Sequence, residues 1–418
     1  MNIIIIGGGF GGVNLAMGLA GNTCYDVTLI DKNNYNFFPP LIYQVATAFL
    51  DPSSISFPFR KLFHRHENLH FRLGELQTVI PAKNKIILAD SELNYDYLVF
   101  ATGTATNYFG LENIIKNAIP MKTLNDAIEM RNTLLQHLEI ASKTSEAEKN
   151  KYGAIVIAGG GPTGVELSGV FAEMSKTLFA KEYVELAHIK QEIILVDGGQ
   201  ALLKPMSPKS QRYTYEALTK MGVTVKFGVH VKDYVNDKVY LDNGEILDSK
   251  ILIWAAGVSA QKFDGLPEPS YDKNNRMIVN ELNRLINTEN IYAIGDTCIQ
   301  TTDLNYPGGH PQVAQVAIQQ GKNLAKNFVA MQKKSSPTPF NYFDKGSMAI
   351  IGKNKAVVDL PQLGLHFSGF TAWLMWLFVH LTFLVNYRNS IKTFINWTAA
   401  YFSGDQSLRM IIRPRRKN

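Results

Sequence analysis

The sequence predicts an α/β protein with two parallel-sheet domains and a C-terminal module of a different kind. The first observation is a glycine-rich loop at residues 7–12 that follows an apolar, β-branched run. The second is a loop of the same design at residues 159–164, deep inside the chain. The third is an apolar, aromatic-rich run at residues 370–385. Each loop is expected to form a tight turn between a strand and the start of a helix, as in an open parallel sheet.

Both loops have the G-x-G-x-x-G spacing. The first, Gly7-Gly8-Gly9-Phe10-Gly11-Gly12, follows Ile3 to Ile6, and the second, Gly159-Gly160-Gly161-Pro162-Thr163-Gly164, follows Ala154 to Ala158. Glycine is needed because the backbone must approach a pyrophosphate closely, while N–H groups at the helix N-terminus attract the phosphate oxygens. The loops therefore predict two Rossmann-like dinucleotide-binding domains. Glycine turns of ordinary loops are the alternative.

An acidic residue ends the next strand in the first domain. A helix over Val13 to Ala20 and a strand over Asp26 to Ile30 lead to Asp31, which Lys32 follows. The acid that binds ribose hydroxyls lies about 20 residues after such a loop. The first half therefore has a nearly complete dinucleotide fingerprint.

In the second domain the corresponding strand, Glu192 to Val196, ends in Asp197. Gly198 and Gly199 follow, with no arginine beside them. A carboxylate at this position favours NADH over NADPH, because it would repel the additional phosphate of NADPH.

A further motif distinguishes the two nucleotides. An apolar strand from Ile291 ends in Gly295-Asp296, where a carboxylate can accept a hydrogen bond from a ribityl hydroxyl. The helix that follows is expected to aim its N-terminus at the flavin pyrophosphate. With Tyr97 to Phe100 and Ala101-Thr102-Gly103, this pattern resembles the two-dinucleotide-binding flavoprotein superfamily over residues 1 to about 335. The resemblance implies that the first loop binds FAD and the second binds NAD(P)H.

The residues that this reasoning assigns form two sets. The expected FAD-binding residues are Gly7, Gly9, Phe10, Gly11, Gly12, Asp31, Lys32, Ala101, Thr102, Gly103, Gly295, Asp296, Ala314 and Gln315. The expected NADH-binding residues are Gly159, Gly161, Pro162, Thr163, Gly164, Glu166, Asp197, Ala256 and Gly257.

Composition and cysteine usage narrow the class of protein. The chain has 418 residues, of which 46% are hydrophobic and 19% charged, which suits two or three globular domains. Its net charge of +6 is concentrated in residues 413–417, without aromatic residues between the basic ones, so no nucleic-acid partner is expected.

Cys24 and Cys298 are too few for a disulfide framework and are interpreted as small buried residues. Because Asn2 already belongs to a strand, no leader is expected.

The C-terminal run from Phe370 to Val385 is shorter than the about 20 residues of a spanning helix. Arg388, Lys392 and a second aromatic segment, Phe394 to Phe402, follow it. This pattern predicts helices that lie in the membrane interface, with tryptophans at the level of the lipid headgroups. The alternative is a buried core helix or the interface of a homodimer.

The expected organisation has four segments. Residues 1–118 and 260–335 form the FAD-binding domain, 119–259 the NADH-binding domain, and 336–418 the membrane-associating module. An amphipathic helix is expected over Leu124 to Ala141, and the polar run Ser142 to Lys151 should be solvated. His64, His66 and His70 lie among other polar residues, so no metal site is expected.

Taken together, these motifs resemble the type II NADH dehydrogenases, single-chain NADH:quinone oxidoreductases that do not pump protons. The motifs that carry the resemblance are Pro40 to Thr47, Gly161 to Leu167, Trp254 to Val258, Ala314 to Gly321, Asp344 to Ala349 and Gly369 to Trp373. Ser368 departs from the family, in which a lysine often precedes the last motif. The resemblance implies hydride transfer from NADH to FAD and then two-electron transfer to a membrane quinone, ubiquinone or menaquinone.

Matching motifs imply site residues. Glu166, Gln315 and Gln319 are the expected catalytic residues; Gln44, Thr47, Gln315, Gln319 and Thr371 are the expected quinone-binding residues. Gln315 and Gln319 are four residues apart, so they face one side of their helix. Glu166 is expected on the first turn of its helix near the nicotinamide, although an acid there also stabilises a helix by itself.

Disulfide reductases of the superfamily are excluded, because the segment Phe38 to Thr47 contains no cysteine pair. Three other functions remain as alternatives. Sulfide:quinone oxidoreductase is disfavoured by cysteine placement, although Cys298 lies near the Gly-Asp motif. A soluble NADH oxidase is disfavoured by the C-terminal module. A redox-sensing flavoprotein like apoptosis-inducing factor is the non-enzymatic alternative. For the enzyme, the expected location is the cytoplasmic face of the cell membrane, as a peripheral or monotopic protein in contact with membrane lipid.

Overall fold

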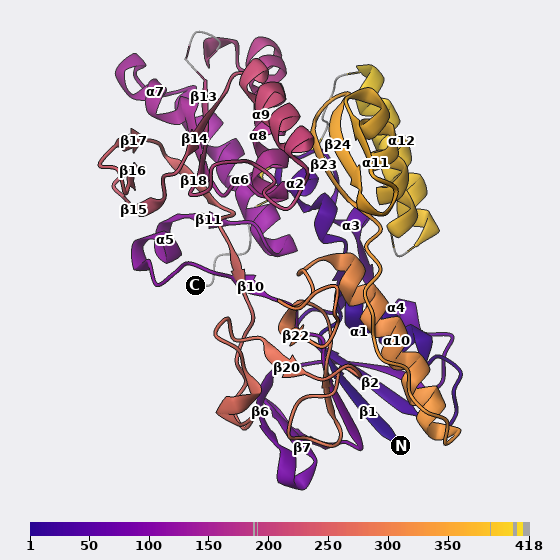
Figure 1. Cartoon of the computed structure of the whole chain (residues 1–418). Helices are drawn as coiled ribbons and strands as arrows, with labels where there is room; N and C mark the ends of the chain where they lie inside the picture. Colours follow the sequence, from indigo (N-terminus) through magenta and orange to yellow (C-terminus); the bar gives the residue numbers. More distant parts are fainter. Residues whose placement is uncertain (187–188, 190, 385, 404–407, 413–418) are drawn as a thin grey trace. The chain divides into compact units, whose positions relative to one another are not determined.

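The computed structural model describes the chain except residues 187–188, 190, 385, 404–407 and 413–418 (Figure 1). The basic cluster at 413–417 therefore lies outside the described residues. The chain forms two compact units, each assembled from separate segments. Unit 1 contains residues 1–37, 56–105 and 258–344, and unit 2 contains residues 38–55, 106–257 and 345–418.

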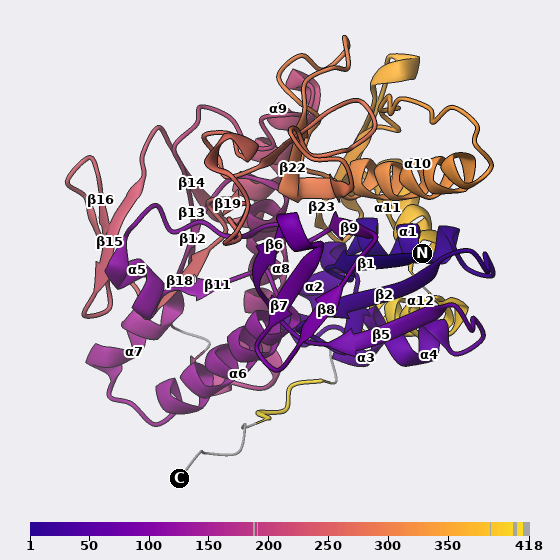
Figure 2. The same ribbon diagram turned by 90° about the horizontal axis from the view of Figure 1, so that it is seen from below.

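Unit 1 is built on a five-stranded parallel sheet with the order β21-β9-β1-β2-β5 (Figure 2). The strands are β21 (Ile291–Ala293), β9 (Tyr97–Phe100), β1 (Asn2–Ile6), β2 (Asp26–Asp31) and β5 (Leu69–Leu73). Isoleucines of β1 alternate between two buried faces, because both sides of the sheet are covered.

Helices α1 (Phe10–Gly18) and α10 (Ala314–Gln332) pack against one another on one side of this sheet. They approach closely because glycines face the partner helix. A Cβ at Gly321 would lie 2.5 Å from the carbonyl oxygen of Gly11, and one at Gly18 would lie 2.6 Å from the Cβ of Ala325. No larger side chain fits this crossing without a shift of the helices.

Smaller elements complete unit 1. They are β3 (Tyr35–Phe37), β4 (Ser56–Pro58), α4 (Phe59–Phe63), β6 (Leu76–Ile80), β7 (Lys85–Leu88), β8 (Glu92–Asn94), β20 (Met277–Val279) and β22 (Cys298–Gln300). The chain passes between the units at β10 (Ala105–Thr106) and β19 (Val258–Ser259).

Unit 2 repeats the sheet design, with the order β11-β18-β12-β13-β14. The strands are β11 (Ile119–Pro120), β18 (Ile251–Trp254), β12 (Ala154–Ala158), β13 (Glu192–Asp197) and β14 (Val223–Phe227). The other elements of its nucleotide-binding part are α5 (Glu112–Asn117), α6 (Leu124–Ala141), α7 (Glu146–Gly153), α8 (Pro162–Lys181), α9 (Pro208–Met221), β15 (Val231–Val235), β16 (Lys238–Leu241) and β17 (Ile246–Asp248).

Local sequence signals explain the ends of the helices in unit 2. Helix α6 has the predicted bounds, because Thr123 and Asp126 form a reciprocal capping box at its start. The run Ser142 to Lys151, expected as a solvated helix end or loop, contains most of the separate helix α7.

The C-terminal part of unit 2 has three antiparallel strands and two helices (Figure 1). They are β23 (Ser347–Gly352), β24 (Lys355–Leu360), β25 (Leu365–Ser368), α11 (Phe370–Phe383) and α12 (Tyr387–Ser403). The short helices α2 (Ile42–Ala46) and α3 (Pro52–Ile55), from early in the chain, also belong to this unit.

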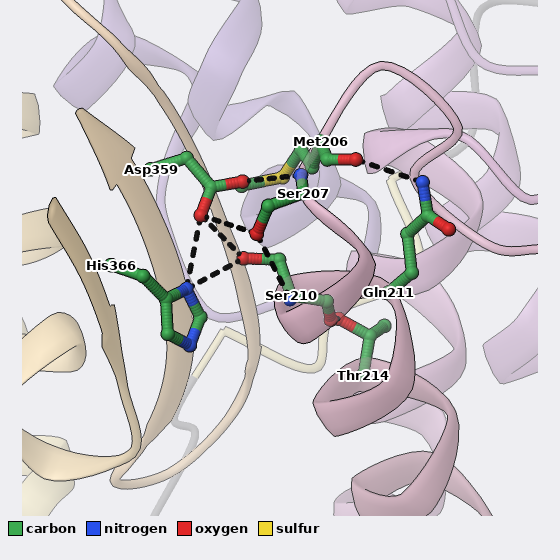
Figure 3. Close-up of polar contacts among 7 residues, drawn as sticks. All are labelled: Met206, Ser207, Ser210, Gln211, Thr214, Asp359 and His366. Atoms are coloured by element: carbon green, nitrogen blue, oxygen red, sulfur yellow. Dashed lines mark hydrogen bonds and ion pairs between the residues drawn. The ribbon is translucent and has the colours of Figure 1, made fainter. Parts of the chain in front are cut away.

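One carboxylate joins the C-terminal strands to α9 (Figure 3). Asp359 on β24 accepts hydrogen bonds from the backbone N–H and hydroxyl of Ser207, at 2.7 and 2.9 Å, and from the Ser210 hydroxyl at 2.8 Å. The Nδ1 of His366 on β25 lies 3.0 Å from the same carboxylate. Although burial raises its pKa, hydrogen bonds from Ser207, His366 and Ser210 leave the pKa of Asp359 below its ordinary value. The carboxylate is thereby an additional cap for α9.

One local prediction was wrong. Cys24 is exposed, because it precedes β2 in a surface turn, whereas Cys298 is buried as expected. Residues Gly295 to Thr297 form a single 3₁₀ turn that leads into β22. The helix expected after the Gly-Asp motif, with Gln315 and Gln319 on it, is α10, which begins at Ala314.

Candidate functional site

The first glycine loop forms a cradle that only glycine permits. Gly7 has a φ of +103°, and a Cβ there would lie 2.4 Å from the carbonyl oxygen of Ala101. A Cβ at Gly12 would lie 2.0 Å from the carbonyl oxygen of Gly7. The loop therefore presents bare backbone at the start of α1, as close binding of a pyrophosphate requires.

Asp31 fixes this loop from the end of β2. Its two carboxylate oxygens each accept a 2.7 Å hydrogen bond, one from the Gly8 N–H and one from the Asn33 N–H. Burial raises the pKa of Asp31 despite these hydrogen bonds. Lys32, also predicted to bind FAD, is exposed beside it, and Phe10 is half-buried at the start of α1.

The second glycine loop has the same geometry in unit 2. Gly159 has a φ of +111°, and a Cβ there would lie 2.3 Å from the carbonyl oxygen of Ala255. A Cβ at Gly164 would lie 1.8 Å from the carbonyl oxygen of Gly159. Asp197 accepts hydrogen bonds from the Gly160 and Gly199 N–H groups at 2.6 and 2.7 Å.

Both loops stand where the strand order changes direction. In each sheet the loop follows the central strand, β1 or β12. The strand on one side of it ends in an aspartate. The strand on the other side leads into Ala101-Thr102-Gly103 in unit 1 and into Ala255-Ala256-Gly257 in unit 2. Dinucleotides bind at such switch points, outside the carboxyl ends of the strands. The glycine cradles therefore fit two dinucleotides, one in each unit.

Three hydrogen bonds position the Gly295-Asp296 turn in unit 1. The Gly295 N–H donates to Gln320 Oε1 at 2.7 Å, and Gln312 Nε2 donates to the Asp296 carbonyl at 2.8 Å. The hydroxyls of Thr102 and Thr297 lie 3.0 Å apart. Sequence reasoning missed Gln312 and Gln320. Gln312 precedes the first residue of α10, so no helical spacing links it to Gln320.

Ala314, Gln315 and Gln319 lie on the first two turns of α10 in unit 1. Gln319 pairs with both backbone groups of Phe343, with Nε2 donating at 2.9 Å and Oε1 accepting at 3.1 Å. Gln315 is half-buried. In the structure Gln319 therefore anchors the segment that follows α10.

Unit 2 contains a cavity of about 950 Å³. Its wall is mostly apolar and aromatic and comes from α2, α8, the β23–β24 hairpin and helices α11 and α12. Three predicted residues, Gln44, Thr47 and Glu166, line it together. Thr371 is exposed on the first turn of α11 and is not among the lining residues.

Glu166 is the buried acid of this cavity. It is the fifth residue of α8, one turn further along than expected, so a role as a helix-start acid does not explain it. Burial raises its pKa well above the ordinary value, although the Ile350 N–H donates to it. Buried Tyr43, whose pKa is raised by burial and then by Glu166, lies on the neighbouring helix α2.

Gln44 joins α2 to α12. Its Oε1 accepts a 2.7 Å hydrogen bond from the indole N–H of Trp397, and its Nε2 donates to the Tyr43 hydroxyl at 2.8 Å. Thr47 donates to the Tyr43 carbonyl at 2.9 Å. These buried contacts hold the polar groups of α2 in fixed positions on the cavity wall.

Glu173 is a second carboxyl of the cavity wall, and sequence reasoning missed it. It lies seven residues after Glu166 on α8, a spacing that returns to the same helix face and could have revealed it. Its Oε1 accepts a 2.6 Å hydrogen bond from the Lys353 N–H. Burial raises its pKa, although Lys355, Lys353 and Lys176 act in the opposite direction.

Cys298 is buried behind the Gly-Asp turn. Its thiol donates to the Gly295 carbonyl at 3.3 Å, and burial raises its pKa to about 12. A thiol with so high a pKa is a poor nucleophile at neutral pH. This environment argues against a sulfide-oxidising role for Cys298.

Helices α11 and α12 expose a large apolar surface. Exposed side chains include Phe370, Leu374, Phe378, Phe383, Tyr387, Ile391, Phe394, Ile395 and Phe402. The expectation for tryptophan was wrong in two cases: Trp376 is fully buried and stacked 3.8 Å from the His380 ring, and Trp397 is buried against α2. Among the described helices, none is both long and apolar enough to cross a membrane.

Comparison with protein families gives two matches. Residues 1–321 match the pyridine nucleotide-disulphide oxidoreductase family, and residues 345–406 match the NDH2 C-terminal domain. A type II NADH:quinone oxidoreductase of Mycobacterium tuberculosis is 34% identical, with 96% of this chain and 87% of that protein covered. A second one from the same organism is 32% identical, with 96% and 88% covered.

Solved structures agree on the fold. The chain is similar to NDH2 from Plasmodium falciparum, solved in complex with NADH, with a TM-score of 0.90, 23% identity and 99% of both chains covered. The sulfide:quinone oxidoreductase of Aquifex aeolicus is less similar, with a TM-score of 0.73, 20% identity and coverage of 99% of this chain and 96% of that one. The predicted α/β fold is thereby confirmed. The chain belongs to the type II NADH:quinone oxidoreductases, flavoenzymes that use FAD and NADH and have a quinone as electron acceptor.

Proposed function

We propose that this enzyme oxidises NADH at the membrane surface and reduces a quinone whose head binds in the cavity of unit 2, without proton pumping. The cavity carries the proposal, because it combines mostly apolar walls with a few fixed polar groups. Such a lining suits a flat apolar ring with polar oxygens. When bound, the flavin accepts hydride and passes electrons onward in pairs.

The residues of unit 1 hold and orient FAD in this proposal. Backbone N–H groups of the 7–12 loop bind the pyrophosphate, and Asp31 binds ribose hydroxyls while it fixes the loop. Ala101 to Gly103 and Gly295-Asp296 close the site, together with Ala314 and Gln315 on α10. The Gln312 and Gln320 hydrogen bonds support these roles, because they fix the turn that carries Asp296.

In unit 2 the 159–164 loop binds the pyrophosphate of NADH, and Asp197 selects NADH over NADPH. The carboxylate accepts hydrogen bonds from the Gly160 N–H in the loop and from the Gly199 N–H, and it repels an additional phosphate. Ala256 and Gly257 follow β18 at the same sheet edge. Glu166 lines the cavity, so we assign it to proton supply for the quinone instead of NADH binding.

For the quinone site, Gln44, Thr47 and Glu166 have direct structural support because they share the cavity wall. Gln315, Gln319 and Thr371 stay predictions that rest on the family resemblance. The quinone can be ubiquinone or menaquinone, because Gln44, Thr47 and Glu166 do not distinguish between the two rings.

The exposed surface of α11 and α12 is the proposed membrane contact. Residues 370–403 contain no Asp or Glu, while Arg388 and Lys392 supply positive charge. Apolar side chains on one surface with basic residues beside them suit an interfacial helix on anionic lipid. We place the enzyme at the cytoplasmic face of the cell membrane as a peripheral or monotopic protein. A homodimer through part of this apolar surface is an additional proposal, as is the division into segments 1–118, 119–259, 260–335 and 336–418.

Steady-state assays test the proposed function. Purified, FAD-loaded enzyme should oxidise NADH rapidly when a short-chain quinone is present and should turn over NADPH slowly. Bulky substitution in the cavity wall, Thr47→Trp, should raise the KM for quinone while FAD content stays normal. Sulfide-dependent quinone reduction, or rapid NADH turnover with oxygen alone, would contradict the proposal.

A further inference from the structure

Two acids from one helix share the wall of the cavity in unit 2. Glu166 and Glu173 are seven residues apart on α8, so their side chains leave the same face about 10 Å apart along the helix axis. Between them the wall includes Val170, also from α8. The cavity is large enough to hold several water molecules, which need polar partners such as these carboxyls.

The two acids differ in their access to solvent. Glu166 is buried, 9% exposed, close to Tyr43. Glu173 is half-buried, next to the exposed side chains of Lys176 and Lys353. Glu173 therefore lies at the end of the cavity wall that is nearer to solvent, and Glu166 lies further inside.

The proposed reaction requires a proton from solvent. Reduction of a quinone to its quinol takes two electrons and two protons. NADH supplies a hydride, which carries both electrons and one proton, so the balanced reaction is NADH + H⁺ + quinone → NAD⁺ + quinol. Since the apolar walls separate a bound quinone from bulk water, the additional proton needs a route of titratable groups and water.

On the basis of the quinone site proposed above, we propose that Glu173 is the proton inlet of the cavity. Glu173 takes a proton from solvent and releases it to water inside the cavity. That water reprotonates Glu166, which donates its proton to a quinone oxygen. Glu173 is thus a relay residue, and Glu166 is the group that contacts the substrate.

The surroundings of Glu173 suit uptake and release of protons. Burial raises the pKa of both acids, so a larger fraction of each is protonated near neutral pH than for an ordinary glutamate. Lys176 on α8 and Lys353 and Lys355 on the β23–β24 hairpin favour the ionised form of Glu173 after it releases a proton. Tyr43 on α2 is the other titratable group that interacts with both acids.

The test is the variant Glu173→Gln in the FAD-loaded enzyme. Glutamine keeps an oxygen that accepts the Lys353 N–H, but it cannot carry the proton. Stopped-flow absorbance of the flavin separates the NADH half-reaction from the quinone half-reaction. We expect the NADH half-reaction to stay within about twofold of wild type and the quinone half-reaction to slow by about tenfold or more, increasingly as the pH rises.

Three further readouts distinguish a proton relay from a structural role. Imidazole added near pH 7 should partly restore the quinone half-reaction of Glu173→Gln, because it supplies a diffusible acid. The infrared difference between wild type and this variant should show a protonated carboxyl at pH values where an ordinary glutamate is ionised. The double variant with Glu166→Gln should be no slower than the slower single variant, because both residues serve one route.

Glu216→Gln is the matched control, since Glu216 is an exposed helical glutamate of the same unit, on α9. It should leave both half-reactions unchanged. A wild-type rate and pH profile in Glu173→Gln would overturn the proton inlet, and so would strictly additive effects of the two acids. Wild-type enzyme that oxidises NADH without reducing quinone would instead overturn the proposed function.

Discussion

At the residue scale, Asp31 and Asp197 each hold a glycine loop from the end of a strand. Each ends the strand that follows its glycine loop in the chain and accepts hydrogen bonds from two backbone N–H groups, one of them that of the second glycine of the loop. The spacing after the first loop predicts that Asp31 binds ribose hydroxyls. The hydrogen bonds to the loop are a second task, which only the coordinates display.

This pairing leads to a prediction with an internal control. Asp197→Asn keeps one acceptor oxygen and loses the charge, so kcat/KM for NADH should fall by roughly 10- to 100-fold while FAD content stays normal. The preference for NADH over NADPH should also narrow. Asp31→Asn should instead lower FAD occupancy, measured as the ratio of flavin absorbance to protein concentration. Equal loss of FAD in both variants would contradict the assignment of the two loops.

Glu166 leads to a prediction about stability and pH. Its pKa is raised in the folded enzyme, whereas an unfolded glutamate has a pKa of about 4.3. The ionised side chain is therefore disfavoured by folding, and stability is lost as the pH rises from about 4.3 through the raised pKa. Glu166→Gln cannot ionise, so its thermal midpoint should exceed that of wild type by an amount that grows with pH.

The free-energy difference should approach about 1.4 kcal/mol for each pH unit that separates the two pKa values. Melting curves of both proteins between pH 5 and 8 measure it. Glu216→Gln, at an exposed position on α9, controls for the general effect of replacing a glutamate by glutamine. A difference for Glu166→Gln that does not change with pH would show that burial does not perturb this acid.

At the scale of elements, the amphipathic pattern of residues 124–141 correctly predicted helix α6. The segment after Gly295-Asp296 was harder, because a short turn and β22 there are fixed by tertiary hydrogen bonds from Gln312 and Gln320. The cavity was predicted only in part. Gln44, Thr47 and Glu166 belong to recognisable motifs, whereas Glu173 lies outside them, and only its seven-residue spacing from Glu166 on α8 points to it.

The contact between α9 and the C-terminal strands leads to a prediction at this scale. Asp359→Asn should destabilise unit 2 by about 1.5–3 kcal/mol near neutral pH, because four donors share this carboxylate. The pKa of Asp359 is lowered in the folded state, so its contribution is present above about pH 3.9, the unfolded value, and is lost as the pH falls through the lower folded value. Thermal melts at several pH values measure the effect.

The control for this prediction is another aspartate paired with a histidine. Asp242 lies 2.9 Å from His230 Nδ1 on an exposed part of the same unit, so Asp242→Asn should change the melting temperature little. Equal effects of Asp359→Asn and Asp242→Asn would mean that Asp359 does not join the C-terminal strands to α9.

At the scale of the whole molecule, the composition of the C-terminal run correctly indicated exposed apolar helices but not which side chains face outward. Trp376 and His380 point inward, because together with Ala372 they form one stripe at four-residue spacing along α11. Burial lowers the pKa of His380 to about 4, so it is neutral at physiological pH. The outward surface is made of Phe, Ile, Leu and Tyr instead.

The membrane proposal predicts a loss of lipid binding without a loss of chemistry. Ile391 and Ile395 are 55% and 58% exposed on α12 and do not line the cavity. The double variant Ile391→Ser, Ile395→Ser should bind anionic vesicles roughly 100-fold more weakly and still reduce a water-soluble quinone. Co-sedimentation with vesicles measures binding. Ile246→Ser, at a comparably exposed position on β17, should bind normally, and undiminished binding of the double variant would contradict the proposal.

The close crossing of α1 and α10 has a consequence for synthesis on the ribosome. The helix that Gly11 faces is completed roughly 300 residues after Gly11 itself, which at about 5–20 residues per second takes some 15 to 60 seconds. During that time the face of α1 that carries Gly11 and Gly18 lacks its final partner, while Leu15 and Ala16 can already pack with residues of β1 and β2. Substitutions at Gly321 should therefore reduce the yield of soluble protein, even though Gly321 lies far from either glycine loop in the sequence.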